Sequence, residues 1–261
     1  MKRNSCFICL LSLIILFFSV LPSYNQGINQ KTGSRNKPVI PEIPGMVYVE
    51  EGEFIAGSST AFDYESPQHI VSLKGFYIDK YEVTNQQYKK FIDATGYPAP
   101  IDWRNNTFRP GEDSLPVVNI SYYNALAYAK WAGKRLPTEQ EWEKTARYND
   151  GRRYPWGNTW RKTCANVRPV IGFSKLKPIG SYPDGVSKYG AYDMAGNVWE
   201  WTDSSFLPYP GNKVFNQNYN EKNKVIRGGS YRQSELIAEC CRRDFLEMNS
   251  TRTDVGFRCA K

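Results

Sequence analysis

One short run, residues 190–201, constrains the fold of this chain more than any other segment. It places two glycines, two carboxylates and two tryptophans in a stretch that fits neither a helix nor a strand. Glycine adopts backbone angles that other residues avoid, so the run predicts a convoluted loop. The carboxylates of Asp193 and Glu200, with exposed carbonyls between them, could form a calcium cage. The alternative interpretation is a buried turn whose tryptophans belong to the core.

The N-terminus has the features of a secretory signal. Lys2 and Arg3 precede an apolar run over about residues 6–21, and a helix-breaking proline follows. We therefore predict a signal peptide over residues 1–25 and a protein that is secreted or periplasmic. The apolar run is marginally short for a membrane span, so the sequence indicates membrane contact only through an uncleaved signal.

The rest of the chain is predicted to form a single domain. Residues 26–43 are polar and rich in glycine and proline, which is typical of a flexible lead-in. No internal repeat or second linker follows, so one domain should span residues 44–261. An aromatic content of 15% suits a loop-rich protein in which large rings anchor irregular backbone. The formal charge of +8 is spread along the chain without a dense basic cluster, so no nucleic-acid partner is indicated.

Local patterns predict an α+β fold with low secondary-structure content. Alternating runs indicate a small antiparallel sheet near the start of the domain; they are residues 46–50, 53–57, 69–73 and 76–79. Three helices should follow, because a serine or threonine precedes each helical pattern as an N-cap. In two of them, a Gln or Glu three residues later completes a capping box. The helices start at Thr84, Ser121 and Thr138. Loops dominate after residue 148, up to closing strands at residues 225–231 and 256–260.

Several classes of active site are excluded. His69 is the only histidine, so the chain has neither a Ser-His-Asp triad nor a histidine-rich zinc or iron site. The Gly228-Gly229 pair lacks the lysine and the spacing of a phosphate-binding loop. Carboxylate pairs such as Glu139 and Glu141 are explained by helix capping.

Four cysteines follow the predicted leader, and they are Cys164, Cys240, Cys241 and Cys259. A bond between the adjacent pair would be strained, and on a strand their sulfurs would face opposite sides. In that arrangement Cys164 and Cys259 would each bond one of the neighbours as a structural staple. The alternatives are a strained vicinal disulfide or free thiols with redox chemistry.

A series of short motifs occurs in a fixed order from residue 45 onward. They are GMV (45–47), FYIDKYEVTN (76–85), PVVN (116–119), WAGKRLPTE (131–139), WE (142–143), YPWGN (154–158), GAYDMAGNVWEW (190–201), RGGSY (227–231) and GFRC (256–259). In this order they resemble the formylglycine-generating enzyme (sulfatase-modifying factor) family. The resemblance implies a single compact domain with a C-type-lectin-like core, sparse secondary structure and bound calcium.

The resemblance also implies positions for the family's ligands. One calcium site would use the Asp193 and Glu200 side chains with the Gly196 and Val198 carbonyls. The other would begin at Asn166 and the Val167 carbonyl. Trp199, Ser230 and Arg243 match the family's pocket tryptophan, active-site serine and substrate-contacting arginine.

The chain departs from the family at the copper site. Members with oxidase activity hold copper(I) with two cysteines shortly after the RGGS motif and oxidise a substrate cysteine to formylglycine. Here the first of those positions is Gln233, and the second falls near Glu235 or Ala238. Copper(I) requires soft thiolate ligands, so copper is not expected here. Cys240 and Cys241 are adjacent, and an extended chain would not aim both sulfurs at one metal.

Two main functions follow from these features. The first is a secreted, non-oxidase binding or structural module whose partner is a protein, peptide or glycan in the envelope or extracellular space. The second is an oxidoreductase that converts a substrate cysteine to formylglycine with displaced metal ligands. A calcium-dependent glycan binder is a third possibility.

Overall fold

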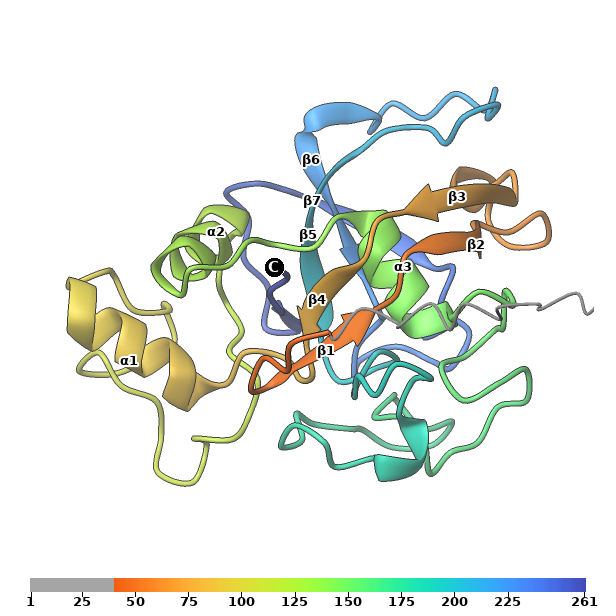
Figure 1. The fold of residues 1–261 in the computed structure, drawn as a ribbon. Coiled ribbons are helices and arrows are strands. Elements are labelled where there is room, and N and C mark those ends of the chain that lie inside the picture. The colour runs from red at the N-terminus through yellow and green to blue at the C-terminus, as the bar shows by residue number, and fades with distance from the viewer. Residues whose placement is uncertain (1–39) are drawn as a thin grey trace, which may run out of the picture. The chain divides into compact units, whose positions relative to one another are not determined.

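The computed structural model describes residues 40–261, which contain three small sheets and three α-helices (Figure 1). The strand orders are β1–β4, β2–β3 and β7–β6–β5–β8. The strands are β1 Met46–Val49, β2 Gly52–Ala56, β3 His69–Leu73, β4 Phe76–Asp79, β5 Trp199–Phe206, β6 Asn220–Arg227, β7 Arg243–Glu247 and β8 Val255–Gly256. The predicted leader and most of the predicted lead-in lie outside the described residues.

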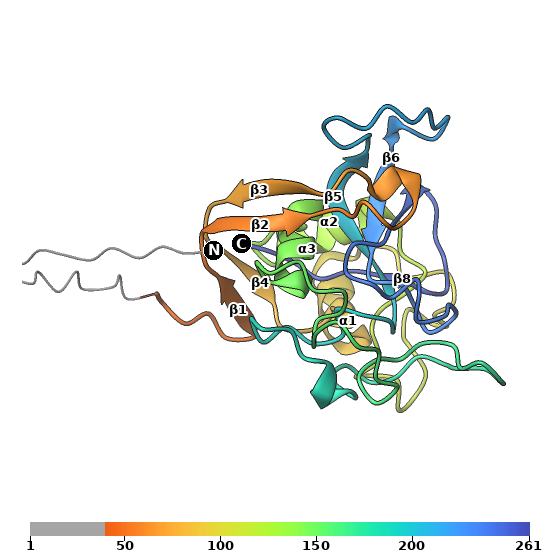
Figure 2. The same cartoon turned by 90° about the vertical axis from the view of Figure 1, so that its right-hand side faces the viewer.

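The first four strands lie where the alternating patterns predict them. They form two separate antiparallel pairs, β1 with β4 and β2 with β3 (Figure 2). The turn out of β2 begins at Gly57, whose φ is +67°. A Cβ there would lie 2.8 Å from the carbonyl oxygens of Glu65 and Pro67, so only glycine fits this close approach.

The three predicted helices are confirmed as α1 Asn85–Thr95, α2 Tyr122–Trp131 and α3 Glu139–Arg147. Each begins at a Ser or Thr cap whose hydroxyl accepts a backbone N–H three residues on, and each has a capping box. Gly96 ends α1 in the left-handed conformation. These signals involve only neighbouring residues, which is why the sequence predicts them correctly.

The prediction for residues 190–201 is correct for its first part and wrong for its last residues. Gly190, Asp193, Gly196 and Asn197 all have positive φ, so the backbone up to Val198 is a convoluted loop. From Trp199 onward, however, the chain is β5, a central strand of the four-stranded sheet. β5 pairs with β6 on one side and runs parallel to β8 on the other.

A large aromatic cluster lies between the helices α1 and α2 and the central sheet. Tyr88 and Tyr128 stack with their ring centroids 5.7 Å apart, and Phe257 meets both rings edge-on. Trp199 and Trp201, 1% and 0% exposed, complete the cluster from β5. Both tryptophans therefore belong to the core, as one interpretation of the loop proposed.

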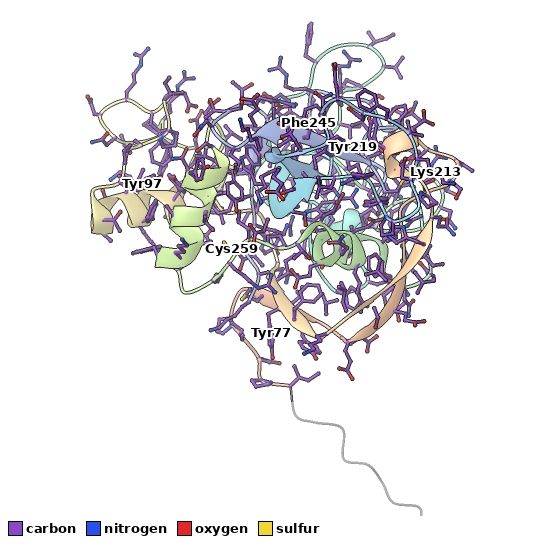
Figure 3. All side chains as sticks on the ribbon, turned by 90° about the horizontal axis from the view of Figure 1, so that it is seen from above. Tyr77, Tyr97, Lys213, Tyr219, Phe245 and Cys259 are labelled. Atoms are coloured by element: carbon purple, nitrogen blue, oxygen red, sulfur yellow. The ribbon has the colours of Figure 1, made fainter. Side chains whose placement is uncertain are left out.

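The other face of β5–β7 carries a second aromatic group. Phe206 packs against Tyr219 and Phe245 with centroid distances of 5.1 and 4.6 Å, and Figure 3 labels the two partners. The guanidinium of Arg243 lies 4.8 Å from the Phe206 ring and 4.2 Å from the Tyr209 ring. Aromatic side chains thus cover both faces of this sheet.

A buried network of charges joins α3 to the central sheet. Glu143, which is 1% exposed, accepts hydrogen bonds from the Gly57 amide and Arg147, each 2.9 Å long, and from Arg227 on β6. Glu139 accepts a 2.8 Å hydrogen bond from Arg243 on β7. Because these charges are paired in a dry environment, removal of one partner would leave the other uncompensated.

The final segment of the chain ties several elements together. Lys261 exchanges backbone hydrogen bonds with Tyr77 of β4, and Ala260 does so with Arg135 before α3. The Arg258 guanidinium donates to the carbonyls of Asp79 and Tyr192. Within residues 40–261, no helix combines the length and hydropathy that a membrane span needs.

Candidate functional site

The side chain of Gln233 links the tryptophan and the serine that the family resemblance singles out. Its amide oxygen accepts a 2.8 Å hydrogen bond from Trp199 Nε1 and lies 3.0 Å from Ser230 Oγ. The strand β5 supplies the tryptophan, and the turn after β6 supplies the other two. Gln233 thus occupies the oxygen-rich centre of a polar cluster rather than presenting a soft ligand.

Ser230 is held from a second side by Asp254. The two side-chain oxygens lie 2.8 Å apart, and Arg252 clamps the carboxylate with two hydrogen bonds of 2.9 Å. The serine is 1% exposed. No histidine lies in this cluster, so the Ser–Asp contact lacks the base of a catalytic triad.

Two small cavities open on either side of Gln233. One of about 120 Å³ is lined by Phe62, Tyr64, Glu65, Trp199, Gln233, Ile237, Arg242, Arg243 and Asp244. The other, of about 420 Å³, is lined by Arg232, Gln233, Arg252, Thr253 and Asp254. Since one water occupies roughly 30 Å³ of liquid, the first has room for a small side chain and the second for a larger polar group.

Arg243 lies at the first cavity but does not present a free guanidinium to it. Its side chain is 1% exposed, and it binds Glu139 with Nη2. Nη1 donates to the carbonyl oxygens of Tyr64 and Leu207 at 3.0 and 3.1 Å. The arginine is therefore part of the buried charge network, and its role here is to hold β7 against α3.

Glu200, an expected calcium ligand, is fully engaged by other side chains. Arg258 donates to both of its carboxylate oxygens at 2.7 Å, and Trp142 Nε1 donates to one of them at 2.8 Å. Glu200 and Arg258 are both 0% exposed. The negative charge of this carboxylate is therefore already neutralised by a guanidinium.

Asp193 lies in the same buried region, with Glu82 as a further carboxylate. Burial raises the pKa of Asp193 to about 6, and the negative charge of Glu200 adds to that rise. Burial, together with Asp193 and Glu200, also raises the pKa of Glu82. Within residues 40–261, Arg258 pairs with Glu200 and is also the cation that lowers the pKa values of Asp193 and Glu82, so a bound cation would offset an excess of negative charge.

The fit to calcium is therefore partial. Asp193 and the carbonyls of Gly196 and Val198 are hard oxygen donors of the kind that calcium takes. Glu200 does not fit, because its oxygens are held by Arg258 and Trp142. Among the described residues, no group of three or more His, Cys, Asp or Glu side chains is placed to hold a metal. A site that combines one carboxylate with backbone carbonyls does not need such a group.

The other expected calcium ligands, Asn166 and Val167, lie at the base of a surface loop. The Asn166 amide accepts from Ser174 Oγ at 2.6 Å and donates to the Lys175 carbonyl and Asn197 Oδ1, each at 2.9 Å. The side chain is thus used to close the loop, and residues 161–183 contain no Asp or Glu. This donor set does not fit calcium.

All four cysteines in the described part of the chain are buried free thiols. The predicted disulfide staples are thus absent from residues 40–261. Cys240 packs with Trp142 and Met194, whereas Cys259 belongs to the aromatic cluster of α1 and α2. Cys240 and Cys241 lie in a turn before β7, not on a strand as the pairing argument assumed.

The buried thiols are poor metal ligands. Burial raises the pKa of Cys241 to about 12, and it also raises the pKa values of Cys240 and Cys259. Copper(I) binds the thiolate, so protonated thiols at neutral pH do not supply its ligand. At the expected copper positions, Gln233 is hydrogen-bonded and Ala238 is packed among alanines. These residues do not fit copper.

The fold, the loop before β5 and the Trp199–Ser230 cluster define a domain of the formylglycine-generating enzyme type. Residues 31–261 match the sulfatase-modifying factor enzyme 1-like domain (FGE-sulfatase). The chain therefore belongs to this family. Its fold is also that of PvdO from Pseudomonas aeruginosa, with a TM-score of 0.67 and 25% identity over 82% of this chain and 93% of that structure.

Relatives of known name differ in activity. Formylglycine-generating enzyme of Mus musculus is 31% identical, over 82% of this chain and 74% of the relative. Inactive C-alpha-formylglycine-generating enzyme 2 of the same organism is 30% identical, over 83% of this chain and 85% of the relative. Hercynine oxygenase of Mycolicibacterium smegmatis is 33% identical over 71% of this chain. The chain spans 54% of that oxygenase and 39% of another relative that is also 33% identical.

Sequence reasoning missed three members of this site. Gln233 was noted only as a non-ligand, although it joins Trp199 to Ser230. Asp254 and Arg258 carry no local motif that shows their partners, because those partners lie 24 and 58 residues away. Arg258 carries one signal, because it is a charged residue between Phe257 and Cys259 in the GFRC motif, whereas Asp254 follows Arg252 and Thr253 and carries none.

Proposed function

We propose that this protein is a binding module of the formylglycine-generating enzyme family that acts outside the cytoplasm and does not oxidise cysteine. The observation that carries the proposal is the Gln233 amide, which takes part in the Trp199–Ser230 cluster where the family's first copper cysteine is expected. An amide oxygen is a hard metal ligand, and this one already accepts a hydrogen bond from the Trp199 indole.

The same glutamine offers a means of recognition. Among residues 40–261, no partner accepts a hydrogen bond from its amide nitrogen, and the residue lines both cavities. A carbonyl or hydroxyl of a protein, peptide or glycan ligand would accept that hydrogen bond. The indole of Trp199 and the ring of Phe62 supply apolar walls, as in many anchor pockets.

A relative whose name calls it inactive makes a non-oxidase role plausible for this family. That protein and this chain match over most of both lengths. For calcium, we propose a structural role at Asp193 with the carbonyls of Gly196 and Val198. A divalent cation there would offset the excess of buried carboxylates.

The alternative function is formylglycine formation with displaced ligands. The likeness to a formylglycine-generating enzyme favours it. The candidate ligands are then Cys240 and Cys241, and Cys241 lines a cavity of about 290 Å³. The raised pKa of its thiol opposes this function.

Copper(I) titration of the purified protein tests the choice. We expect no stoichiometric binding by the wild-type protein and no difference in a C240S/C241S variant. A Cys-x-Pro-x-Arg peptide should remain unmodified in the presence of copper and oxygen. Tight copper binding that the double variant loses, or an aldehyde on the peptide, would refute the proposed function.

The binding role is tested with glycan and peptide arrays. The wild-type protein and Gln233→Glu are compared, because this change keeps the shape and the acceptor oxygen but removes the amide donor. Ligands that require the donor should lose about tenfold or more in affinity. Equal binding by both proteins would show that Gln233 does not contact the ligand.

A further inference from the structure

A surface loop, residues 168–175, carries the most exposed apolar side chains of the described chain. Val170, Ile171 and Phe173 are 96%, 90% and 97% exposed. In Figure 2 this green-to-teal segment projects from the lower right of the domain, on the side away from β1 and β3. Single exposed apolar residues are common, but three together at a projecting tip require an explanation.

The base of this loop is fixed by hydrogen bonds. The side chain of Asn166, which is 2% exposed, accepts a hydrogen bond from the Ser174 hydroxyl and donates one to the Lys175 carbonyl. The Arg168 amide donates to the Gln233 carbonyl at 2.8 Å. Both ends of the tip are thus held by the core, and the apolar side chains are presented by a built turn.

The tip lies in a basic stretch of the chain. Residues 154–183 contain five Lys and Arg and no Asp or Glu. Arg168 and Lys175 flank the apolar residues, both are exposed, and neither has a carboxylate partner among residues 40–261. Arg232 adds a third exposed cation beside a cavity of about 260 Å³, which is lined by Arg168, Phe173, Ser174, Tyr231 and Arg232.

We propose that residues 168–175 dock this domain on a bilayer surface that contains anionic phospholipids. Val170, Ile171 and Phe173 enter the boundary between headgroups and acyl chains, as the apolar parts of peripheral membrane proteins do. Arg168, Lys175 and Arg232 then lie at the level of the phosphates, where each cation is attracted by the negative surface.

The shape of the tip favours a bilayer over a protein partner. A stable protein interface buries roughly 800 Å² on each side and needs a broad complementary surface. Three side chains on a projecting turn do not provide that area, whereas a bilayer accepts a convex apolar tip without a preformed pocket. Phosphates surround the inserted tip in a bilayer, so each flanking cation has an anionic partner.

Vesicle co-sedimentation tests this proposal. The chain from residue 26 is used, so that the predicted apolar leader does not contribute. We expect binding to phosphatidylcholine vesicles that contain phosphatidylglycerol, and weaker binding without phosphatidylglycerol. The affinity of the variant I171D/F173D for these vesicles should be about 100-fold lower, because each apolar side chain removed from the interface lowers it by about tenfold or more.

Two further variants make the test specific. Phe215→Asp is the matched control, because Phe215 is also 88% exposed but lies on the β5–β6 connection; it should bind as the wild type does. Arg168→Gln with Lys175→Gln should weaken only the binding to anionic vesicles, by about fivefold for each charge. No binding of the wild type to either vesicle, or equal binding by I171D/F173D and F215D, would overturn the proposal. A protein partner in place of lipid would give the first of these results.

Discussion

The buried charges beneath α3 give the sharpest test of how this domain is held together. In Glu143→Gln the side chain keeps its shape and can still accept from the Gly57 amide. The variant removes one negative charge from the network, so Arg227, 0% exposed, retains only Glu139 as a carboxylate, 3.5 Å from its Nε. Removal of one partner from a buried ion pair costs about 3–5 kcal/mol.

For a domain of this size, 1 kcal/mol lowers Tm by about 2–4 °C, so Glu143→Gln should lower it by about 10 °C. Glu141→Gln is the matched control on the same helix. Its partner, Arg135, is 44% exposed, and a surface pair contributes at most about 1 kcal/mol. Glutamine also keeps the capping box of α3. The assay is urea and thermal unfolding of both variants beside the wild type. Losses that agree within 1 kcal/mol would refute the claim that burial makes the Glu143 network critical.

Three further predictions concern other parts of the structure. Burial raises the pKa of Asp193 to about 6 from 3.8, so the folded state binds the proton more tightly than the unfolded state does. Without calcium, the free energy of unfolding should therefore fall by up to about 3 kcal/mol as the pH rises from 4 to 6. Urea unfolding of Asp193→Asn should show a smaller dependence on pH. A Cβ on Gly196 would lie 2.4 Å from the Asn166 carbonyl oxygen, so Gly196→Ala should lower the free energy of unfolding by more than about 2 kcal/mol. Gly172 also has a positive φ but faces open space, so Gly172→Ala should lower it by about 1 kcal/mol. Ellman titration of the chain from residue 26 should find almost no reactive thiol in the native protein. After denaturation without a reducing agent it should find four, and fewer than four would reveal disulfides.

The sequence predicts those parts of the fold that depend on near neighbours. Thr84 and Thr138 begin helices because their hydroxyls cap amides three residues away, and Gly96 ends a helix because it tolerates positive φ. The start of strand β5 was missed because residues 199–202 are buried on both faces, and the face opposite Trp199 and Trp201 carries the charged residue Glu200. Glu200 is tolerated there only because Arg258, from the far end of the chain, neutralises it.

For the candidate site, the sequence indicates which residues to compare but not which contacts they make. The family resemblance implies that Trp199, Ser230 and Arg243 share a pocket; in the structure Trp199 and Arg243 line the cavity of about 120 Å³, and Ser230 contacts Gln233 beside it. It does not reveal that Arg243 is committed to Glu139, because that pairing depends on how β7 packs against α3. The same limit applies to the cysteines, because their spacing in the sequence does not show that they are buried in separate clusters.

The closing segment, residues 258–261, also determines when this domain can finish folding. A polypeptide is synthesised from its N-terminus, so the early strands and helices emerge before the residues that join them. Until Arg258 arrives, Glu200 has no guanidinium to neutralise it. Native assembly of the central sheet must therefore wait until residues 258–261 have left the ribosome, although the partners that they join were synthesised long before.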